Sequence, residues 1–520
     1  MKSDLSSKWI LGCTFAITLL CQWVVTTDTA YLDSDDWFIV RMGREVVDTP
    51  PTDLSEPLTR FWTEEPTWRP LSVLLSGLEH AILGDNPRYR VGFHGLLHLA
   101  CAWMIFLLAS RWLQSSQVGA WSAILYTVHP IHGETLAWFH SGFEAVPITL
   151  MILITLWLFT TQRRTWLVLL SFQAALFFRE NAICIPFLIT AIAASRAAPK
   201  SRWREILTVS GPYWIVLAIN AIGRIVVLKN TMNNDASMLQ SFHITGDLWG
   251  SILHVLAQPW FPVHPSVWAS TAWFVLFAVL GAALVVLHWQ VGTRRQLGIV
   301  WGFFLLTCLP VALQLHDAAI FHDAISGDHD QRWYFFHLPI AALMTWAAAL
   351  LVHKQRWGTP ILVGLAGLFL VLQVLHMRWW TERGRLVTSI ENTIELAVRE
   401  TPDSAIGIVL KTQSASADLV EQAVLNRAIR LLRSPQDVPV FRVLMLSGGS
   451  PNDRAMSAVN SHGELLWHAA PASPPRPIQW LEWNEVDQNL VMIEVDPTQW
   501  PGLVPSNNRG NTTHDLTWSH

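Results

Sequence analysis

Long apolar runs recur along most of the chain and constrain its fold more than any other feature. A helix needs about 20 apolar residues to cross the roughly 30 Å of hydrocarbon in a bilayer, and about eleven runs reach or approach that length. The first run, Trp9 to Val25, is followed by acidic residues and lacks a small-residue cleavage site, so we interpret it as a membrane anchor and not as a removed signal peptide. The other predicted spans are Val91 to Ser110, Val118 to His129, Phe143 to Thr160, Trp166 to Phe178, Ala182 to Ala194, Ile206 to Leu228, Trp268 to Trp289, Leu297 to Leu315, Trp333 to Val352 and Pro360 to Met377.

The composition supports a polytopic α-helical membrane protein. Only 14% of the residues are charged, compared with roughly 25% in a soluble domain, and the 29 Trp residues are of the type that collects at membrane interfaces. A net charge of -4 creates no strong field of one sign, so nucleic acid is not an expected partner. All five cysteines lie in apolar runs without metal-ligand spacing, so disulfides and zinc–thiolate sites are not expected either.

Basic residues predict the orientation of the spans. They fall on alternate loops, which the positive-inside rule places in the cytoplasm together with the amino terminus. The C-terminal part then lies outside, provided that Leu71 to Leu83 and Ile252 to Phe261 are interfacial or re-entrant helices and not spans. The connections expected on the non-cytoplasmic side are Thr26 to Arg90, Pro130 to Gly142, Lys229 to Val267 and His316 to Arg332, with the turn at Arg179 and Glu180.

The chain is expected to form two domains and a tail. Residues 1–380 form the membrane domain, with a first outer loop at residues 26–90. Residues 381–505 are more polar and are expected to form an extracytoplasmic α/β domain, and residues 506–520 are expected to be a flexible tail. The α/β prediction rests on helical periodicity in Thr388 to Glu400 and Asp418 to Leu432, and on β-rich runs at Ala405 to Leu410, Val438 to Leu446 and Leu490 to Val495.

Acidic residues gather directly after the first span. Asp33, Asp35 and Asp36 lie within four positions, where mutual repulsion raises at least one pKa and prepares a general base if a cation or a proton donor is near. The alternative is a solvated acidic turn that ends the helix.

Histidines and charged pairs provide the other candidate site residues. His129, His132 and Glu134 could bind a metal ion or a substrate hydroxyl, or could be hydrogen-bonded structure; a metal would need further ligands from elsewhere. Arg179 and Glu180 interrupt an apolar stretch, so they either close a helical hairpin or line a binding site.

Two more arginines are suited to binding a lipid phosphate. Arg332 and Tyr334 lie at the head of a predicted span, after a loop rich in His and Asp that could also hold a divalent cation although its spacing matches no tight ligand motif. Arg69 could pair with an anionic lipid group, or its segment could be an interfacial anchor.

Taken in order, these features resemble the GT-C superfamily of integral-membrane glycosyltransferases, which use polyprenyl-phosphate sugars. The resemblance is to the membrane half of the transmembrane-and-TPR-containing O-mannosyltransferases and their bacterial relatives, and covers about residues 25–345. The expected α/β domain stands where a tetratricopeptide array would follow, so acceptor recognition is not carried over. The residues that carry the resemblance are Asp35-Asp36, Arg69-Pro70, Gly84 to His98, His129 to Trp138 (HPIHGETLAW), Arg179-Glu180 in place of the usual Lys-Glu, and Arg332 to Pro339 (RWYFFHLP).

The resemblance implies an inverting transfer of a sugar from a polyprenyl-phosphate donor to a hydroxyl of a protein or glycan acceptor outside the cytoplasm. Asp35 is then the catalytic base, supported by Asp36. Arg332, Arg179 and Arg69 stabilise the leaving phosphate. The donor sugar is a hexose such as mannose, glucose or galactose, or an aminosugar. Whether a divalent cation acts as a cofactor stays open. The residues that position the substrates are His129, His132, Glu134, Glu180 and Tyr334.

Two other classes of function fit parts of the sequence. A transporter or flippase of a lipid-linked saccharide would share the spans and the outer charges, although transporters often contain repeated halves and no repeat is evident in this sequence. A noncatalytic scaffold would tolerate replacement of Asp35. The absence of cysteine outside the predicted spans and of a retention signal favours a bacterial inner membrane, with the active site and the C-terminal domain facing the periplasm or the outside.

Overall fold

The computed structural model describes two compact units of the chain. Residues Met1–Thr27 with Met42–Trp380 form the first, which we call the membrane unit, and Asp28–Arg41 with Thr381–His520 form the second, which we call the C-terminal unit. The described residues are 2–31, 34–60, 68–196, 202–229, 294–314, 337–353, 355–400, 405–410, 443–447, 457–459, 465–467, 478–484 and 489–493.

Helices and the short turns between them make up the described part of the membrane unit. Among the described residues, five segments are long and apolar enough to cross a membrane, which confirms an α-helical integral membrane protein. They are Trp9–Asp28, Pro87–Trp112, Phe139–Thr160, Arg202–Val226 and Trp357–Ile390. The total of eleven spans stays a prediction, since the predicted span Trp268 to Trp289 lies outside the described residues.

The helices follow one another along the chain, most of them with short connections. They are α1 (Lys2–Val25), η1 (Thr26–Asp28), α2 (Ser34–Asp48), α3 (Ser55–Arg60), α4 (Pro70–Leu83), α5 (Pro87–Trp112), α6 (Ser116–Thr127), α7 (His132–Thr135), α8 (Phe139–Thr160), α9 (Thr165–Phe178), η2 (Glu180–Ile183), α10 (Cys184–Arg196), α11 (Arg202–Lys229), α16 (Arg294–Gln314), α18 (His337–His353) and α19 (Gln355–Glu400).

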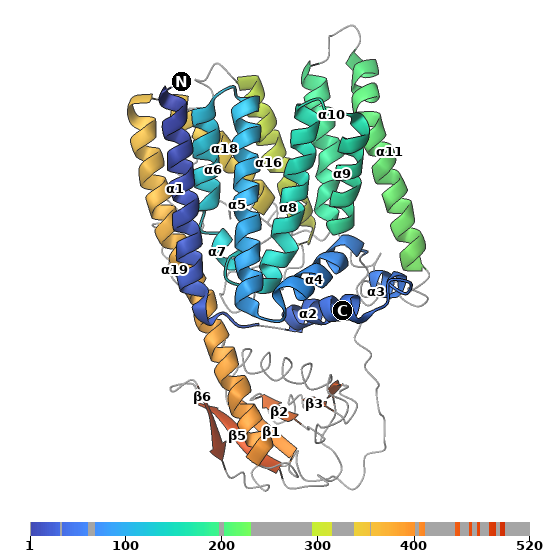
Figure 1. Ribbon diagram of the computed structural model, residues 1–520, viewed down its shortest axis with the longest axis vertical. Helices are drawn as coiled ribbons and strands as arrows, with labels where there is room; N and C mark the ends of the chain where they lie inside the picture. Colours follow the sequence, from blue (N-terminus) through green and yellow to red (C-terminus); the bar gives the residue numbers. More distant parts are fainter. Residues whose placement is uncertain are drawn as a thin grey trace. The chain divides into compact units, whose positions relative to one another are not determined.

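Long helices of the membrane unit run side by side in alternating directions (Figure 1). The connections 128–138 and 179–183 therefore lie at the same end of the bundle as α4. The opposite end carries Arg163, Arg164 and the last turn of α10 with Arg196. This alternation agrees with the predicted grouping of the basic loops on one side, while the identity of the cytoplasmic side stays a prediction.

Local signals explain several helix boundaries. Asn86 caps α5, since its side-chain oxygen accepts a hydrogen bond from the Arg88 amide at 3.0 Å, and a proline follows at the first helical position. Ser115 caps α6 through the Val118 amide at 3.3 Å. Gly84 ends α4 with a φ of 65°, a conformation that glycine adopts without a steric penalty.

The interior of the membrane unit packs around α18. This helix lies against α6 and α16, and its Trp346 stacks at a tilt on Trp301 of α16, with ring centroids 4.9 Å apart. A second apolar cluster joins α8, α9, α10 and α11, with Phe172 fully buried in it. At 14 residues, or about 21 Å, α4 is too short to cross the bilayer as a straight helix.

A sheet lies in the C-terminal unit, with strand order β2-β1-β5-β6. β1 (Ala405–Leu410) pairs in parallel with β2 (Val443–Ser447) and β5 (Ile478–Asn484), and β5 pairs antiparallel with β6 (Asn489–Ile493). β3 and β4 form a separate antiparallel pair at Ser457–Val459 and Leu465–Trp467.

Several sequence predictions for this unit can be compared with these strands. The predicted strand at Ala405 to Leu410 coincides with β1, and the other two predicted strands overlap β2 and β6. β5 was not predicted, because Glu482 and Asn484 break its apolar pattern. Residues 388–400 continue α19 without a break and do not form a separate helix. The predicted helix Asp418 to Leu432 and the tail at 506–520 lie outside the described residues.

Candidate functional site

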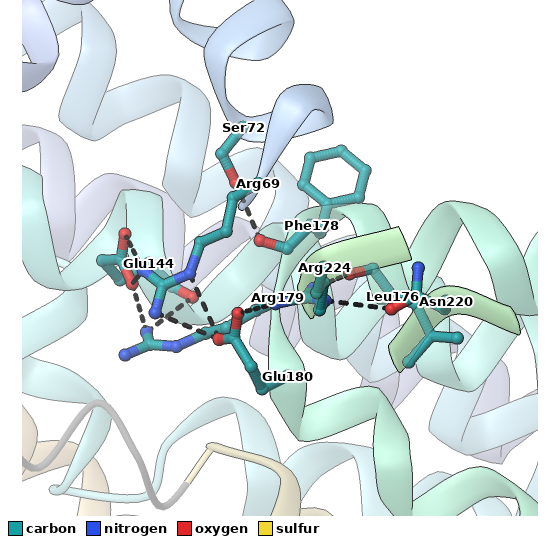
Figure 2. Close-up of polar contacts among 9 residues, drawn as sticks. All are labelled: Arg69, Ser72, Glu144, Leu176, Phe178, Arg179, Glu180, Asn220 and Arg224. Carbon is teal, nitrogen blue, oxygen red and sulfur yellow. Dashed lines mark hydrogen bonds and ion pairs between the residues drawn. The ribbon is translucent and has the colours of Figure 1, made fainter. Parts of the chain in front are cut away.

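Charged side chains from separate elements of the membrane unit meet in one group (Figure 2). Arg69, directly before α4, places its Nη1 atom 3.1 Å from Oε2 of Glu144 on α8. The same guanidinium contacts Glu180 of η2, whose Oε2 lies 3.1 Å from Nη2 and 3.2 Å from Nε. One arginine therefore joins three elements of the chain.

Two further arginines complete the arrangement. Arg179 forms an ion pair with Glu144, and its Nη1 also donates to the main-chain oxygen of Glu144 at 3.3 Å. Arg224 on α11 forms an ion pair with Glu180 and donates to the carbonyl oxygen of Leu176 at 2.5 Å. We call this group the ion cluster; its members are Arg69, Glu144, Arg179, Glu180 and Arg224 (Figure 2).

The local backbone brings these side chains together. Arg69 precedes a proline at the first position of α4, and its side chain makes no capping hydrogen bond to that helix. Arg179 has an extended backbone (φ -164°, ψ 157°), which ends α9 and starts η2. Ser72 Oγ donates to the carbonyl oxygen of Phe178 at 3.0 Å, which fixes the start of α4 against the end of α9.

The ion cluster is buried on one side and open on the other. The side chains of Arg69 and Glu144 are 9% and 7% exposed, whereas that of Glu180 is 36% exposed. Burial by itself raises the pKa of the Glu180 carboxyl, but Arg69 and Arg224 beside it lower the pKa more, to about 2. Glu180 is therefore ionised at neutral pH.

Arginines outnumber glutamates in the ion cluster. It contains three guanidinium groups and two carboxylates. Guanidinium groups match phosphate oxygens through parallel hydrogen bonds. Ionisable groups within a membrane protein are costly and mark functional sites by default. A group of arginines of this kind can bind an anion.

Hydrogen bonds from distant helices hold the 128–138 connection, which contains HPIHGE. Gln22 of α1 donates through Nε2 to the carbonyl oxygen of Leu136 at 3.0 Å. Gln373 of α19 donates to the carbonyl oxygen of Thr127 at 2.8 Å, and His376 Nδ1 donates to that of Pro130 at 3.0 Å. This connection is a fixed part of the fold.

The predicted residues of this connection are buried. His129, His132 and Glu134 each have an exposed fraction of 0%. Glu134 accepts a hydrogen bond from Ser141 Oγ at 2.6 Å. Burial, followed by the neighbouring His337, lowers the pKa of His132 well below its usual range, so this imidazole is neutral.

A second polar network joins α4 to α5. Asp85 forms an ion pair with Arg44 and lies 2.9 Å from His80 Nδ1, while the fully buried Arg90 donates through Nε to the carbonyl oxygen of Gly84 at 2.8 Å. Partial burial raises the pKa of Asp85, but Arg44 and its other cationic neighbours lower it more. This network fixes the turn between the two helices.

The remaining predicted site residues are placed in part. Asp35 and Asp36 lie in α2; Asp36 is buried and belongs to the C-terminal unit, while the side chain of Asp35 is outside the described part. Arg332 and Tyr334 lie outside the described residues.

Sequence reasoning missed two members of the ion cluster. Glu144 and Arg224 are charged residues inside predicted apolar spans, and the rule that singled out Arg179 and Glu180 could have found them. His98 and His337 were missed as neighbours of His132 because they come from α5 and α18.

No protein-family model and no curated protein sequence matches the chain. Among solved structures, similar chains include ArnT from Cupriavidus metallidurans bound to undecaprenyl phosphate, at 12% identity and a TM-score of 0.43, and the same protein in the apo state, at 11% and 0.45; each comparison covers 85% of this chain and 93% of the other.

The oligosaccharyltransferase of Archaeoglobus fulgidus in complex with Zn and sulfate is also similar, at 13% identity and a TM-score of 0.36. That comparison covers 79% of this chain and only 61% of the archaeal one. Superpositions this loose, with TM-scores below 0.5, establish neither a shared family nor a shared activity.

Proposed function

We propose that this protein transfers a sugar from a polyprenyl-phosphate donor to an acceptor hydroxyl on the non-cytoplasmic side of the membrane, with inversion. The observation that carries the proposal is the ion cluster, a partly buried group of three arginines and two glutamates that come from separate elements of the membrane unit. A sugar phosphodiester on a lipid carries one negative charge on a tail that stays in the bilayer. Its phosphate is a group that guanidinium groups bind, and its tail suits a site among membrane helices.

The arginines of the ion cluster have the role of stabilising the leaving group. When the bond between the sugar and the phosphate breaks, the phosphate gains negative charge, and preorganised guanidinium groups lower the free energy of that state. Arg69, Arg179 and Arg224 supply these groups, while Glu144 and Glu180 hold them in orientation.

Asp35 is proposed as the general base and Asp36 as its support. The acceptor hydroxyl gives its proton to Asp35, its oxygen forms a bond to the anomeric carbon, and the bond from that carbon to the phosphate oxygen breaks. The products are an inverted glycoside and a polyprenyl phosphate. Arg332 is proposed to bind the phosphate as well.

The other proposed roles concern positioning and sidedness. His129, His132, Glu134 and Tyr334 position the substrates.

The ion cluster and the C-terminal domain face the periplasm or the outside of a bacterial inner membrane, with a protein or glycan as acceptor. The separation of Arg163 and Arg164 from the ion cluster, at opposite ends of the bundle, supports this orientation. The donor sugar is proposed to be a hexose.

Native mass spectrometry of the detergent-purified protein tests the proposal. Wild type is compared with Asp35→Asn, and with Asp53→Asn as a matched control at an exposed position of the first outer loop. The expected result is a co-purifying polyprenyl phosphate with a sugar, enriched in Asp35→Asn because that variant does not turn it over.

Two outcomes would contradict the proposal. The absence of any such lipid from all three proteins, while ordinary phospholipids are retained, would show that the protein does not bind the proposed donor. Equal amounts of the sugar lipid in all three would withdraw the role of Asp35 and favour a transporter of that lipid.

A further inference from the structure

Three imidazoles meet in the interior of the membrane unit, outside the ion cluster. His98 lies on α5, His132 on α7 and His337 at the start of α18. One ring nitrogen from each lies within 4.8 Å of the other two, and the ring centroids of His132 and His337 are 4.0 Å apart. The exposed fractions of the three residues are 0%, 0% and 1%. Three ligand-bearing groups from three elements are thus enclosed together.

His132 is the least satisfied of the three. Neither of its ring nitrogens has a hydrogen-bond partner among the described residues. Burial of such polar atoms without a partner destabilises the folded protein. A buried imidazole without hydrogen-bond partners in a native protein indicates that a further group, such as an ion or a water molecule, bonds to it.

The hydrogen bonds of His98 leave a lone pair for an occupant. Its Nε2 lies 3.2 Å from the carbonyl oxygen of Thr127, which can only accept, so the proton is on Nε2. Its Nδ1 then carries a lone pair, and within the described part of the chain that atom has no hydrogen-bond partner. His98 is therefore held in the form that binds a metal ion.

Hydrogen bonds also orient His337. Thr135 Oγ1 donates to the carbonyl oxygen of His132 at 2.9 Å and therefore accepts from His337 Nε2, 2.6 Å away. Nδ1 of His337 then carries the lone pair and accepts from the Tyr126 hydroxyl at 3.0 Å. Partners of this kind, which fix the tautomer and the orientation of a ring, accompany histidines that bind metals.

We propose that His98, His132 and His337 together bind one divalent transition-metal ion of the zinc class. Imidazole nitrogen suits zinc, and three histidines leave the fourth tetrahedral position for a water molecule. At bond lengths of about 2.0–2.1 Å the three nitrogens would lie about 3.3 Å apart, so the rings close inward by about 1.5 Å or less on binding. His337 exchanges its hydrogen bond from Tyr126 for the metal.

The metal ties the 128–138 connection to α5 and α18. The metal bonds to a ring nitrogen of His132 that otherwise has no partner. Three metal–nitrogen bonds replace the contact between the three imidazole rings. In this role His132 is a ligand, and the positioning role proposed for it above is exerted through the connection that the metal fixes and not by contact with the substrate. The metal site stands whether or not that reaction is correct, because it rests on the geometry of the three imidazoles and not on the ion cluster or Asp35.

Metal content of the full-length protein tests the inference. The protein is purified in detergent with a tag free of histidine and without chelators, then analysed by inductively coupled plasma mass spectrometry. Wild type should hold about one zinc ion per chain, and His132→Asn less than about a fifth of that. His353→Ala, at an exposed position of the same helix as His337, should bind as much as wild type.

A second measurement covers the case in which His132→Asn does not fold. Wild type is stripped with a chelator, and its melting midpoint is followed as zinc is added back. The midpoint should fall on stripping and recover with about one equivalent of zinc. Wild type without bound zinc and with a midpoint that zinc does not change would overturn the proposal, as would a folded His132→Asn that keeps its zinc.

Discussion

Arg69 and Glu180, which are 111 positions apart in the sequence, form an ion pair in which Nη2 and Oε2 are 3.1 Å apart. Arg69 precedes α4, and Glu180 lies in η2. The pair connects a short helix to the turn of a helical hairpin and brings two residues from separate motifs of the sequence into one site.

Arg69→Gln should destabilise the membrane unit. The variant removes the guanidinium from both Glu144 and Glu180, although Arg179 still pairs with Glu144. We expect a loss near the lower end of the about 3–5 kcal/mol that breaking a buried ion pair costs. The melting midpoint in detergent, followed by tryptophan fluorescence, measures the effect.

The matched control is Arg163→Gln, which removes the same charge from an exposed position at the opposite end of the bundle. Its free energy of unfolding should change by about 0.5 kcal/mol or less. If the two variants melt at the same temperature, the ion cluster does not contribute to the fold as described.

The contribution of Glu180 to stability should depend on pH. Its pKa is lowered to about 2 in the folded protein from an ordinary value of 4.5. A carboxyl with a lowered pKa in the folded state stabilises it fully above the ordinary value, and the stabilisation is lost as the pH falls towards the folded value. The difference in melting midpoint between wild type and Glu180→Gln should therefore be constant from about pH 7 to 5.5 and shrink below about pH 4.5. A difference that stays constant down to about pH 3 would show that Glu180 has no lowered pKa.

Gly133 should not tolerate a side chain. A Cβ atom at this position would lie 2.8 Å from His376 Cβ and 2.9 Å from its Nδ1. His376 cannot move aside, because it donates to the Pro130 carbonyl oxygen and accepts from Trp380 Nε1. We expect Gly133→Ala to lower the free energy of unfolding by about 1–3 kcal/mol, the usual range for overpacking.

Gly211→Ala in α11 is the comparison for this variant. Apart from the adjoining residues and backbone of α11 itself, no atom of the described residues lies within 4 Å of a Cβ built there, so the substitution should be neutral or stabilising by up to about 1 kcal/mol. Equal melting midpoints for the two alanine variants would mean that the 128–138 connection is not packed against α19 as described.

Sequence patterns were sufficient for several long apolar helices but not for the contacts between them. The apolar runs predicted α1, α5, α8 and α11, because each helix is long enough to be recognised from its own residues. The presence of charged residues inside an apolar stretch likewise singled out Arg179 and Glu180. No rule of this local kind shows which charged residues pair with one another in the folded protein.

The ion cluster illustrates that limit. Glu144 is 75 positions from Arg69, and Arg224 is 44 positions from Glu180, so their pairing depends on how α4, α8 and α11 pack. The histidines show the same limit: Tyr126 and His337 are 211 positions apart, and HPIHGE alone did not indicate that His337 would lie beside His132.

The most direct test of the account is a native mass spectrometry titration of the protein with a polyprenyl phosphate and, separately, with the polyprenol of the same chain length. The account predicts that wild type binds the phosphate at least about tenfold more tightly than the alcohol, a difference of about 1.4 kcal/mol, and that Arg224→Gln loses most of this preference while Arg163→Gln keeps it. Equal affinity of wild type for the two lipids would contradict the claim that the ion cluster binds a lipid phosphate.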